Sequence, residues 1–406
     1  MVLNRQSSPQ PLPFAEFVAL IASMISLVAL SIDAMLPALA QMGRDLGVAQ
    51  ANDSQLVISM IFLGMAFGQM IYGPMSDIGG RKPAIYLGYG FFLMGSLLAL
   101  FTDQFGVMLA GRFLQGFGLA APRVITLAIV RDLYSGRAMA RVMSFVMMVF
   151  IMVPMIAPAV GQGILSGFGW RAIFGFILLF GLVTAFWFLL RQPESLPPER
   201  RTAFSFARIG GNIAEVLGNP VALGYTLITG LVFSAFVGYL NSAQQLFQLQ
   251  YQLGERFPLY FALLASAIGL ASFINGRLVM RIGMQRPTRI ALTALLAASL
   301  LCLGLLFSLP QNPPLAWLTL YFMVAFLCVG VLFGNLNALA MEPLGHIAGV
   351  GAAVVGSVSM LCSLPLGVFI GRSFNGTPLP LVAGFTFCAA AALLLMLLVE
   401  QRREGG

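Results

Sequence analysis

The chain has 406 residues, of which 59% are hydrophobic and only 9% are charged, and it carries a formal charge of +8. A soluble domain carries roughly 25% charged residues because its surface contacts water, so this composition excludes most soluble enzymes, nucleic-acid binders and disordered proteins. With 1 histidine and 4 cysteines, none of them in a C-x-x-C spacing, we expect neither a metal site nor a cofactor.

Twelve apolar runs follow one another along the chain, and a helix of about 20 such residues crosses a bilayer. Each run must be helical, because an open sheet would leave backbone groups without hydrogen-bond partners in lipid. The runs are 14–40, 54–78, 83–101, 107–133, 138–165, 170–190, 221–249, 258–282, 287–309, 315–341, 347–370 and 379–399. The sequence therefore predicts an all-α membrane protein with twelve transmembrane helices in two six-helix halves.

One connection is long and polar, and it has six predicted spans on each side. We therefore divide the chain into an N-terminal six-helix half (1–191), a cytoplasmic linker (192–219) and a C-terminal six-helix half (220–406). The loops after the second and the eighth span share a weak Gly-x-x-Lys/Arg-Pro repeat. Repeated halves are typical of transporters that bind their substrate near the middle of the membrane.

Basic residues are distributed unequally between the two sides of the membrane. With the N-terminus inside, 16 of the 22 Lys and Arg residues lie on the cytoplasmic side and four lie outside. Cytoplasmic loops are enriched in Lys and Arg. We therefore expect a multi-pass protein of the cell membrane, the inner membrane of a bacterium, with both termini in the cytoplasm.

Asp33 lies inside the first apolar run, between Ile32 and Ala34. A carboxylate inside a membrane span is energetically costly and usually faces a cavity, where it binds ions or protons. We predict that Asp33 binds and releases the proton that drives transport. The alternative is a structural carboxylate that caps a helix or forms an ion pair.

The fourth span carries three polar residues, Arg112, Gln115 and Arg123. At 1.5 Å per residue, Arg112 and Asp33 lie at matching depths of roughly 8–11 Å below the outer boundary, so they can pair if their spans are neighbours. Arg112 would then take part in proton coupling by modulating Asp33. Gln115 lies on the same helix face as Arg112. Arg123 lies near the middle of the span, and an anionic substrate is one possible partner. Snorkelling of Arg112 and simple helix packing of Gln115 are the alternatives.

Polar residues inside the apolar runs of the second half are further candidates for the wall of a substrate cavity. They are Tyr239, Asn241, Gln244, Gln245, Asn335 and Asn337. All of these except Gln244, together with Asp33, Arg112, Gln115 and Arg123, make up the predicted cavity. His346, beside the start of the eleventh span, could sense pH, but a loop or capping role is the simpler interpretation.

The loop after the second span reads Gly73-x3-Asp77-x2-Gly80-Arg81-Lys82. It resembles the motif between spans two and three of the major facilitator superfamily, and the resemblance covers nearly the whole chain. Further segments resemble twelve-span drug:proton antiporters and, among these, the bicyclomycin-resistance (Bcr/CflA-like) branch. These segments are 33–39 in span one, 112–118 with Arg131-Asp132 in span four, and 154–161 in span five.

The resemblance implies a cytoplasmic gate that includes the start of span eleven. Its residues would be Gly73, Asp77, Gly80, Arg81, Arg131 and Asp132. The antiporter motif of span five would comprise Pro154, Ala157, Pro158 and Gly161, with Ala157 where the motif usually has glycine. Proline bends a helix and small residues allow close contact, so this segment would seal a seam between spans. A solvated loop and an ordinary kinked helix are the alternatives.

We predict a secondary active transporter, not an enzyme, that exchanges small amphipathic drugs or metabolites for protons by alternating access. Its partners would be a small-molecule substrate, protons and the lipid bilayer, with no nucleic acid, and we expect a monomer. No phosphate-binding loop is present to use ATP. The alternatives are a dedicated exporter of one metabolite, such as a sugar, amino acid or siderophore, and a passive facilitator.

Overall fold

Almost every described residue is helical in the computed structural model, which describes residues 12–201, 205–308 and 312–404. In these residues, 11 continuous segments are long and apolar enough to cross a bilayer. The longest has 58 residues and contains two helices, so twelve helices can span the membrane. No strand occurs in the described ranges. The predicted all-α fold with twelve spanning helices is confirmed.

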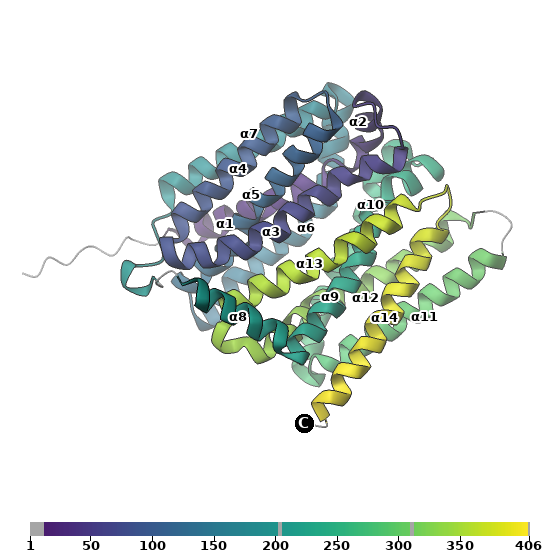
Figure 1. Cartoon of the computed structure of the whole chain (residues 1–406). Coiled ribbons are helices and arrows are strands. Elements are labelled where there is room, and N and C mark those ends of the chain that lie inside the picture. Colours follow the sequence, from purple (N-terminus) through teal and green to yellow (C-terminus); the bar gives the residue numbers. More distant parts are fainter. Residues whose placement is uncertain (1–11, 202–204, 309–311, 405–406) are drawn as a thin grey trace, which may run out of the picture.

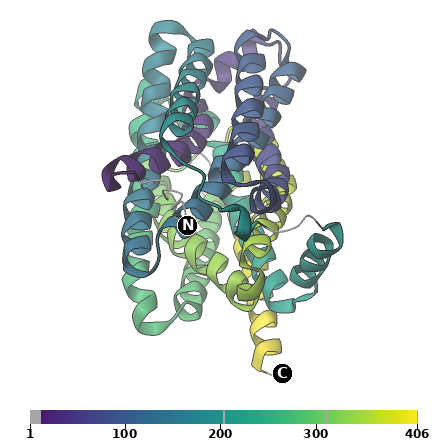
Figure 2. The ribbon, with the colours of Figure 1, turned by 90° about the vertical axis from the view of Figure 1, so that its left-hand side faces the viewer.

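The spanning helices fall into two sets of six. Those of the first half are α1 (Phe14–Asp33), α3 (Leu56–Gly79), α4 (Arg81–Phe101), α5 (Phe105–Leu133), α6 (Gly136–Phe168) and α7 (Trp170–Arg191). Those of the second half are α9 (Pro220–Leu240), α10 (Phe257–Ile282), α11 (Gln285–Ser308), α12 (Leu315–Met341), α13 (Ala348–Arg372) and α14 (Leu379–Glu404). The first set lies mainly above the second in Figures 1 and 2. The halves meet where α3 packs on α13 and α6 packs on α10.

The bundle has two ends that matter for the site. The first and last described residues lie at one end, here called the terminal end (Figure 1). The opposite end, here called the distal end, carries the short helices α2 (Leu39–Asp45) and η2 (Ala51–Gln55).

Two predicted spans are interrupted near the distal end. The run 14–40 is not one helix, because α1 ends at Asp33 and the chain continues through the 3-10 turn η1 (Leu36–Ala38) into α2. Pro37 lies in this turn and has no N–H to continue an α-helical ladder. The run 221–249 likewise divides into α9 and the π-helical segment η4 (Gln244–Gln250). Apolar composition showed the length of these runs but not their changes of hydrogen-bonding pattern.

The polar connection between the halves contains a helix that composition did not reveal. Helix α8 (Phe206–Gly218) follows the turn η3 (Pro198–Arg200) and packs against α13 and α9 (Figure 1). The boundaries 1–191, 192–219 and 220–406 stay predictions. Residues 1–11, 202–204, 309–311 and 405–406 lie outside the described residues, and so does Arg5, one of the cytoplasmic charges counted above.

Helix α5 approaches its neighbours through small residues. A Cβ on Gly116 would lie 1.9 Å from the carbonyl oxygen of Ile61 on α3. A Cβ on Gly118 would lie 2.4 Å from the carbonyl oxygen of Gly88 on α4. Any larger side chain at either position would push these helices apart. The backbone that carries the polar residues of α5 is therefore fixed tightly between α3 and α4.

Candidate functional site

Asp33 is the last residue of α1 and lies where the first span changes from α-helix to a 3-10 turn. The residue is buried, with 7% of its surface exposed. Its carboxylate has no hydrogen bond or ion pair within the described part of the chain. An unpaired carboxylate inside a membrane span is costly and typical of a functional ion or proton site. The structure therefore leaves the group free for the proton-binding role predicted from sequence.

Tyr239 lies close enough to Asp33 for an electrostatic interaction between the two side chains. It belongs to α9, in the second half, and is fully buried. Its hydroxyl has no hydrogen-bond partner among the described residues. Its ring packs edge-on against Phe326, with 4.7 Å between ring centroids. This predicted cavity residue thus packs among aromatic side chains of the second half, within electrostatic range of Asp33.

Helix α6 touches the first span directly beside Asp33. A Cβ on Gly161 would lie 1.9 Å from the carbonyl oxygen of Ala34 and 3.0 Å from its Cα. One turn earlier Ala157 is fully buried, as is expected of a small residue at a helix crossing. Pro158 is buried and Pro154 partly buried in the same stretch. The antiporter-motif segment is placed against the break in the first span, while its sealing role stays a prediction.

Arg112 is fully buried, and three acceptors occupy its guanidinium group. Nε donates to the carbonyl oxygen of Val57 on α3 at 3.0 Å, and Nη2 donates to that of Ser31 on α1 at 2.8 Å. Nη1 donates to Gln115 Oε1 at 2.8 Å. Ser31 is two residues from Asp33, so the depth predicted for Arg112 is close to its actual level. The predicted ion pair with Asp33, however, is not formed among the described residues, because these neutral acceptors hold the guanidinium.

Gln115 extends this network to the next helix. Its Nε2 donates to Ser96 Oγ on α4 at 2.8 Å, so both ends of the carboxamide are bonded within the first half. The ring of Phe174 on α7 lies 5.6 Å from the guanidinium carbon of Arg112. Hydrogen bonds of Arg112 and Gln115 therefore join α5 to α1, α3 and α4.

Arg123 lies 11 residues beyond Arg112 on α5, about three helical turns, and so on nearly the same face. The residue is only partly buried. Its side chain has no hydrogen bond, ion pair or ring contact within the described ranges. It therefore differs from Arg112, whose guanidinium is fully bonded.

Polar residues near the distal end join the two halves. Asn241 exchanges hydrogen bonds with Ser59 of α3, and its Nδ2 lies 3.0 Å from Ser59 Oγ. Gln245 Nε2 donates to Asn52 Oδ1 at 2.8 Å. The sequence predicted Asn241 and Gln245 for the cavity wall. Because α9 ends at Leu240, they lie in the turn after it and in η4, where they bridge the halves, and their place in a cavity wall stays a prediction.

Asn52, Asp53 and Arg372 complete this distal contact and were not identified from sequence. Asn52 Nδ2 donates to the carbonyl oxygens of Arg372 at 2.8 Å and Phe374 at 2.9 Å. Arg372 Nη2 lies 2.7 Å from Asp53 Oδ1. Asn52 and Arg372 are 320 residues apart, and no local pattern connects them. In the sequence each was indistinguishable from an ordinary loop residue.

The two asparagines predicted in α12 point in different directions. Asn335 is buried and exchanges hydrogen bonds of 2.8 Å and 3.1 Å with Asn275 on α10. Asn337 is exposed and makes no hydrogen bond within the described ranges. Residues two positions apart on a helix lie about 200° apart. They therefore face different sides of α12, and their place in the cavity wall stays a prediction.

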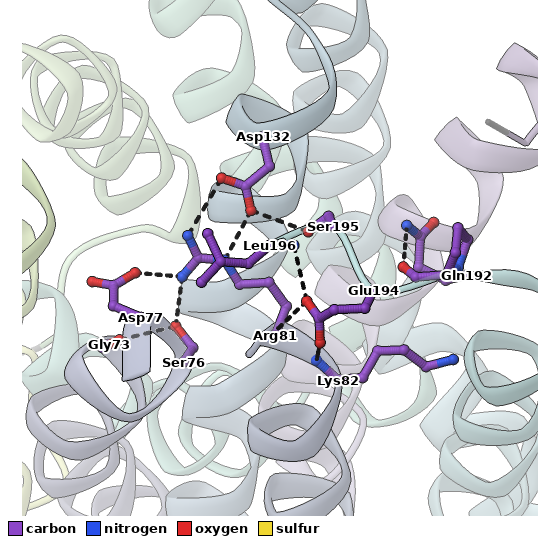
Figure 3. Close-up of polar contacts among 11 residues, drawn as sticks. Gly73, Ser76, Asp77, Arg81, Lys82, Asp132, Gln192, Glu194, Ser195 and Leu196 are labelled. Carbon is purple, nitrogen blue, oxygen red and sulfur yellow. Dashed lines mark hydrogen bonds and ion pairs between the residues drawn. The ribbon is translucent and has the colours of Figure 1, made fainter. Parts of the chain in front are cut away.

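Arg81 is the centre of a group of polar contacts at the terminal end (Figure 3). It is the first residue of α4 and is buried, with 6% exposed. Its Nε lies 2.9 Å from Asp132 Oδ2 at the end of α5, and its Nη1 pairs with Asp77 near the end of α3. The same Nη1 donates to Ser76 Oγ at 2.9 Å. The resemblance implied that Asp77, Arg81 and Asp132 lie together.

Arg131 does not belong to this group, although the resemblance implied that it would. It is exposed and has no ion pair or hydrogen bond within the described part of the chain. Consecutive residues on a helix point about 100° apart. Because Asp132 points toward Arg81, the neighbouring Arg131 points away from it. The predicted gate is corrected accordingly.

Glu194, in the linker, caps the start of α4 and was not singled out from sequence. Its Oε1 accepts from the backbone N–H of Arg81 at 2.9 Å, and its Oε2 accepts from that of Lys82 at 3.0 Å. Gly80 precedes them with φ 102°, and a Cβ there would lie 2.7 Å from Glu194 Oε2. A helix N-terminus favours a carboxylate, and Gly80 supplies no capping side chain. From the sequence, these two facts indicated that a carboxylate from elsewhere in the chain would cap the start of α4.

The start of α13 lies beside this charge cluster. A Cβ on Gly349 would lie 3.6 Å from Asp77 Oδ2, and a Cβ on Gly73 would lie 3.5 Å from the Cβ of Ala353. Ser195 of the linker donates to Asp132 Oδ2 at 3.0 Å. The cluster is thus tied to the first half and its linker and is in close contact with the second half. Its role as a gate stays a prediction.

Comparison with known proteins decides the family. A family model described as Major Facilitator Superfamily matches residues 20–364, which is most of the chain. The chain belongs to the Major Facilitator Superfamily. It is therefore a multi-pass membrane transporter and not an enzyme.

Relatives within the superfamily match along nearly their whole length. The uncharacterized MFS-type transporter YdgK of Bacillus subtilis (strain 168) is 30% identical over 358 residues, 87% of this chain and 88% of YdgK. A bicyclomycin resistance protein homolog of Haemophilus influenzae is 29% identical over 390 residues, 92% and 93% of the two chains. The multidrug resistance protein MdtL of Salmonella heidelberg is 26% identical over 364 residues, 89% of each chain. The resemblance to the bicyclomycin-resistance branch is confirmed.

A solved structure supports the fold independently. The crystal structure of the human organic anion transporter MFSD10 (TETRAN) aligns with a TM-score of 0.70 and covers 96% of this chain and 99% of that one. The two sequences are 18% identical, so the likeness shows the major facilitator fold alone.

Proposed function

We propose that this transporter exports small amphipathic compounds, drugs or metabolites, in exchange for protons. Asp33 is the observation that carries the proposal, because its buried carboxylate has no partner within the described residues and lies where the first span breaks. A buried carboxyl group in a two-half transporter can take up a proton when it is open to one side of the membrane and release it when it is open to the other. Relatives named for multidrug and bicyclomycin resistance support export of such compounds.

Alternating access follows from the two places where the halves meet. Opening of the distal end separates Asn52 from the second half and breaks the Asp53–Arg372 ion pair. Opening of the terminal end moves Asp77 away from the first turn of α13. The protein would rock between these two openings around Asp33, as transporters built from two halves do.

We further propose that the protein is a monomer in a bacterial inner membrane, with the terminal end in the cytoplasm. The support is the excess of Lys and Arg in the loops of that end and the bacterial sources of its relatives. A membrane-impermeant maleimide tests the orientation in intact cells, using a background without the native cysteines. Gln50→Cys, at the distal end, should react, and Glu199→Cys, in the linker, should not.

The proposal is tested with Asp33→Asn in inside-out membrane vesicles. Wild-type protein should accumulate amphipathic compounds against a gradient when a pH gradient is imposed. Asp33→Asn should fold but lose this uphill accumulation. Asp103→Asn is the matched control, because the side chain of Asp103 is 85% exposed and pairs with Arg171 at the surface. Retained uphill accumulation by Asp33→Asn would show that another group couples proton and substrate.

The same vesicles separate the remaining functions. A passive facilitator would equilibrate the compounds without accumulating them. A dedicated exporter of one metabolite would show no competition among chemically unrelated compounds, whereas a multidrug exporter would.

A further inference from the structure

The interior of the transporter contains more positive than negative charge. With α12 and α13 counted separately, three charged residues of the described part lie at least seven residues inside the ends of the spanning segments: Asp33, Arg112 and Arg123. The interior therefore keeps one excess positive charge even when Asp33 is ionised. A charge inside a membrane protein is normally paired, hydrogen-bonded or directed into a cavity.

The two arginines differ in whether their charge is hydrogen-bonded. Arg112 is fully buried, and its three hydrogen bonds to Val57, Ser31 and Gln115 use most of its donors. Arg123 is partly exposed and makes no polar contact within the described ranges. Arg123 is thus the intramembrane charge that a ligand can both reach and satisfy.

The packing of α5 turns Arg123 toward the inside of the bundle. Ala120 contacts α3 and Ala121 contacts α4, which assigns two sides of the helix. At 100° per residue, Arg123 lies within about 20° of Arg112, whose guanidinium reaches the Ser31 carbonyl on α1. Arg123 is also about 16 Å further along the helix than Arg112. It therefore lies too far from the level of Asp33 to pair with it.

We infer that Arg123 binds an acidic group of the transported compound, so that the preferred substrates are small organic anions with an apolar body. This inference rests on the export function proposed above and specifies its substrate class. A guanidinium binds a carboxylate through two parallel hydrogen bonds, which gives strength and direction. With Asp33 ionised, one bound anion brings the interior charge to zero, whereas a cationic drug would raise it to two. In the state in which Asp33 has released its proton and an anionic substrate is bound, the net charge of the interior is thus zero.

The test uses three probes of matched shape and different charge. These are 1-naphthylacetate (anion), 1-naphthylacetamide (neutral) and 2-(1-naphthyl)ethylamine (cation). Binding to purified full-length protein is measured by calorimetry, and uptake is measured in inside-out proteoliposomes with an imposed pH gradient. Variants are Arg123→Gln, Arg123→Lys, which keeps the charge, and Arg277→Gln, which removes an exposed arginine at the end of α10.

Wild-type protein should bind the anion at least tenfold more tightly than the amide or the amine. Arg123→Gln should weaken binding of the anion by roughly tenfold to a hundredfold, the usual value of a hydrogen bond to a charged group, and leave the amide unchanged. Arg123→Lys should keep most of the preference, and Arg277→Gln all of it. The preference of the wild type is measured without any variant, so it stays informative if Arg123→Gln does not fold.

Equal binding of the three probes by wild type, or an unchanged preference in Arg123→Gln, would overturn the inference about substrate charge. In that case proton-driven uptake of the amide or amine would leave the export function intact. Preferential binding of the anion without proton-driven uptake of any probe would contradict the export function and leave the anion site standing.

Discussion

Asn52→Ala should weaken the closure of the distal end. The side chain of Asn52 donates to the Arg372 carbonyl oxygen at 2.8 Å and the Phe374 carbonyl oxygen at 2.9 Å, and it accepts from Gln245 at 2.8 Å. Each of these bonds between the halves contributes about 0.5–1.5 kcal/mol, and water replaces part of that when they break. A net loss of about 1–2 kcal/mol would lower the ratio of distally closed to distally open protein roughly 5- to 30-fold.

Pulsed electron paramagnetic resonance measures this ratio directly. Spin labels at Gln50→Cys in the first half and Glu255→Cys in the second half, in a background without the native cysteines, report the distance across the distal end. Asn312→Ala is the matched control, because Asn312 also donates to a carbonyl oxygen, that of Gly376, but within the second half. Identical distance distributions for Asn52→Ala and Asn312→Ala would refute the view that Asn52 holds the distal end closed.

Three further substitutions test other contacts. Gly161→Ala puts a Cβ 1.9 Å from the Ala34 carbonyl oxygen, so α6 must move by over 1 Å. Proteoliposomes with this variant should lose an imposed pH gradient faster than wild type. Gly163→Ala, whose Cβ would meet open space, should not increase this leak. Glu194→Gln removes the carboxylate from the α4 N-terminus and should cost about 0.5–2 kcal/mol, seen as a lower melting temperature than that of Glu199→Gln. Tyr239→Phe removes the hydroxyl near Asp33 and should slow proton-coupled transport several-fold while ligand affinity is kept; a rate equal to that of Tyr260→Phe would contradict this role.

The fold could be predicted from sequence because one physical requirement dominates it. Each span must be apolar over about 20 residues, and its backbone N–H and C=O groups must form hydrogen bonds within the helix. The apolar runs are visible in the sequence, and the helical structure follows from them. The ends of spans were less predictable. The run 14–40 is apolar on both sides of Asp33 and Pro37, so hydropathy alone did not show that α1 ends at Asp33.

Site residues could be predicted where the energetic cost of a side chain depends on its neighbours in the sequence. They could not be predicted where their partners are distant in the sequence. Asp33 was found because a carboxylate in an apolar run is costly wherever it points. Asp77 and Arg81 are four residues apart, and helical spacing brings them together. Glu194 reaches the start of α4 from 113 residues away, and Asn52 reaches Arg372 from 320 residues away. No local pattern records such contacts.

Depth along a helix was easier to predict than direction around it. Counting residues placed Arg112 near the level of Asp33, and its guanidinium does reach Ser31. The count could not show that backbone carbonyl groups, not the carboxylate, would bind it. For Asn335 and Asn337 the spacing of two residues places them on different faces of α12, but it could not show which face is buried.

The most direct test of the central claim is a count of protons released on ligand binding. Purified protein in weakly buffered solution is mixed with a compound that the vesicle assay shows to be transported, and the released protons are measured with a pH indicator. Wild-type protein should release up to one proton per bound ligand, and Asp33→Asn should release none while still folded. Equal release by both proteins, or no release by ligand-saturated wild type, would contradict the claim that Asp33 exchanges its proton for substrate.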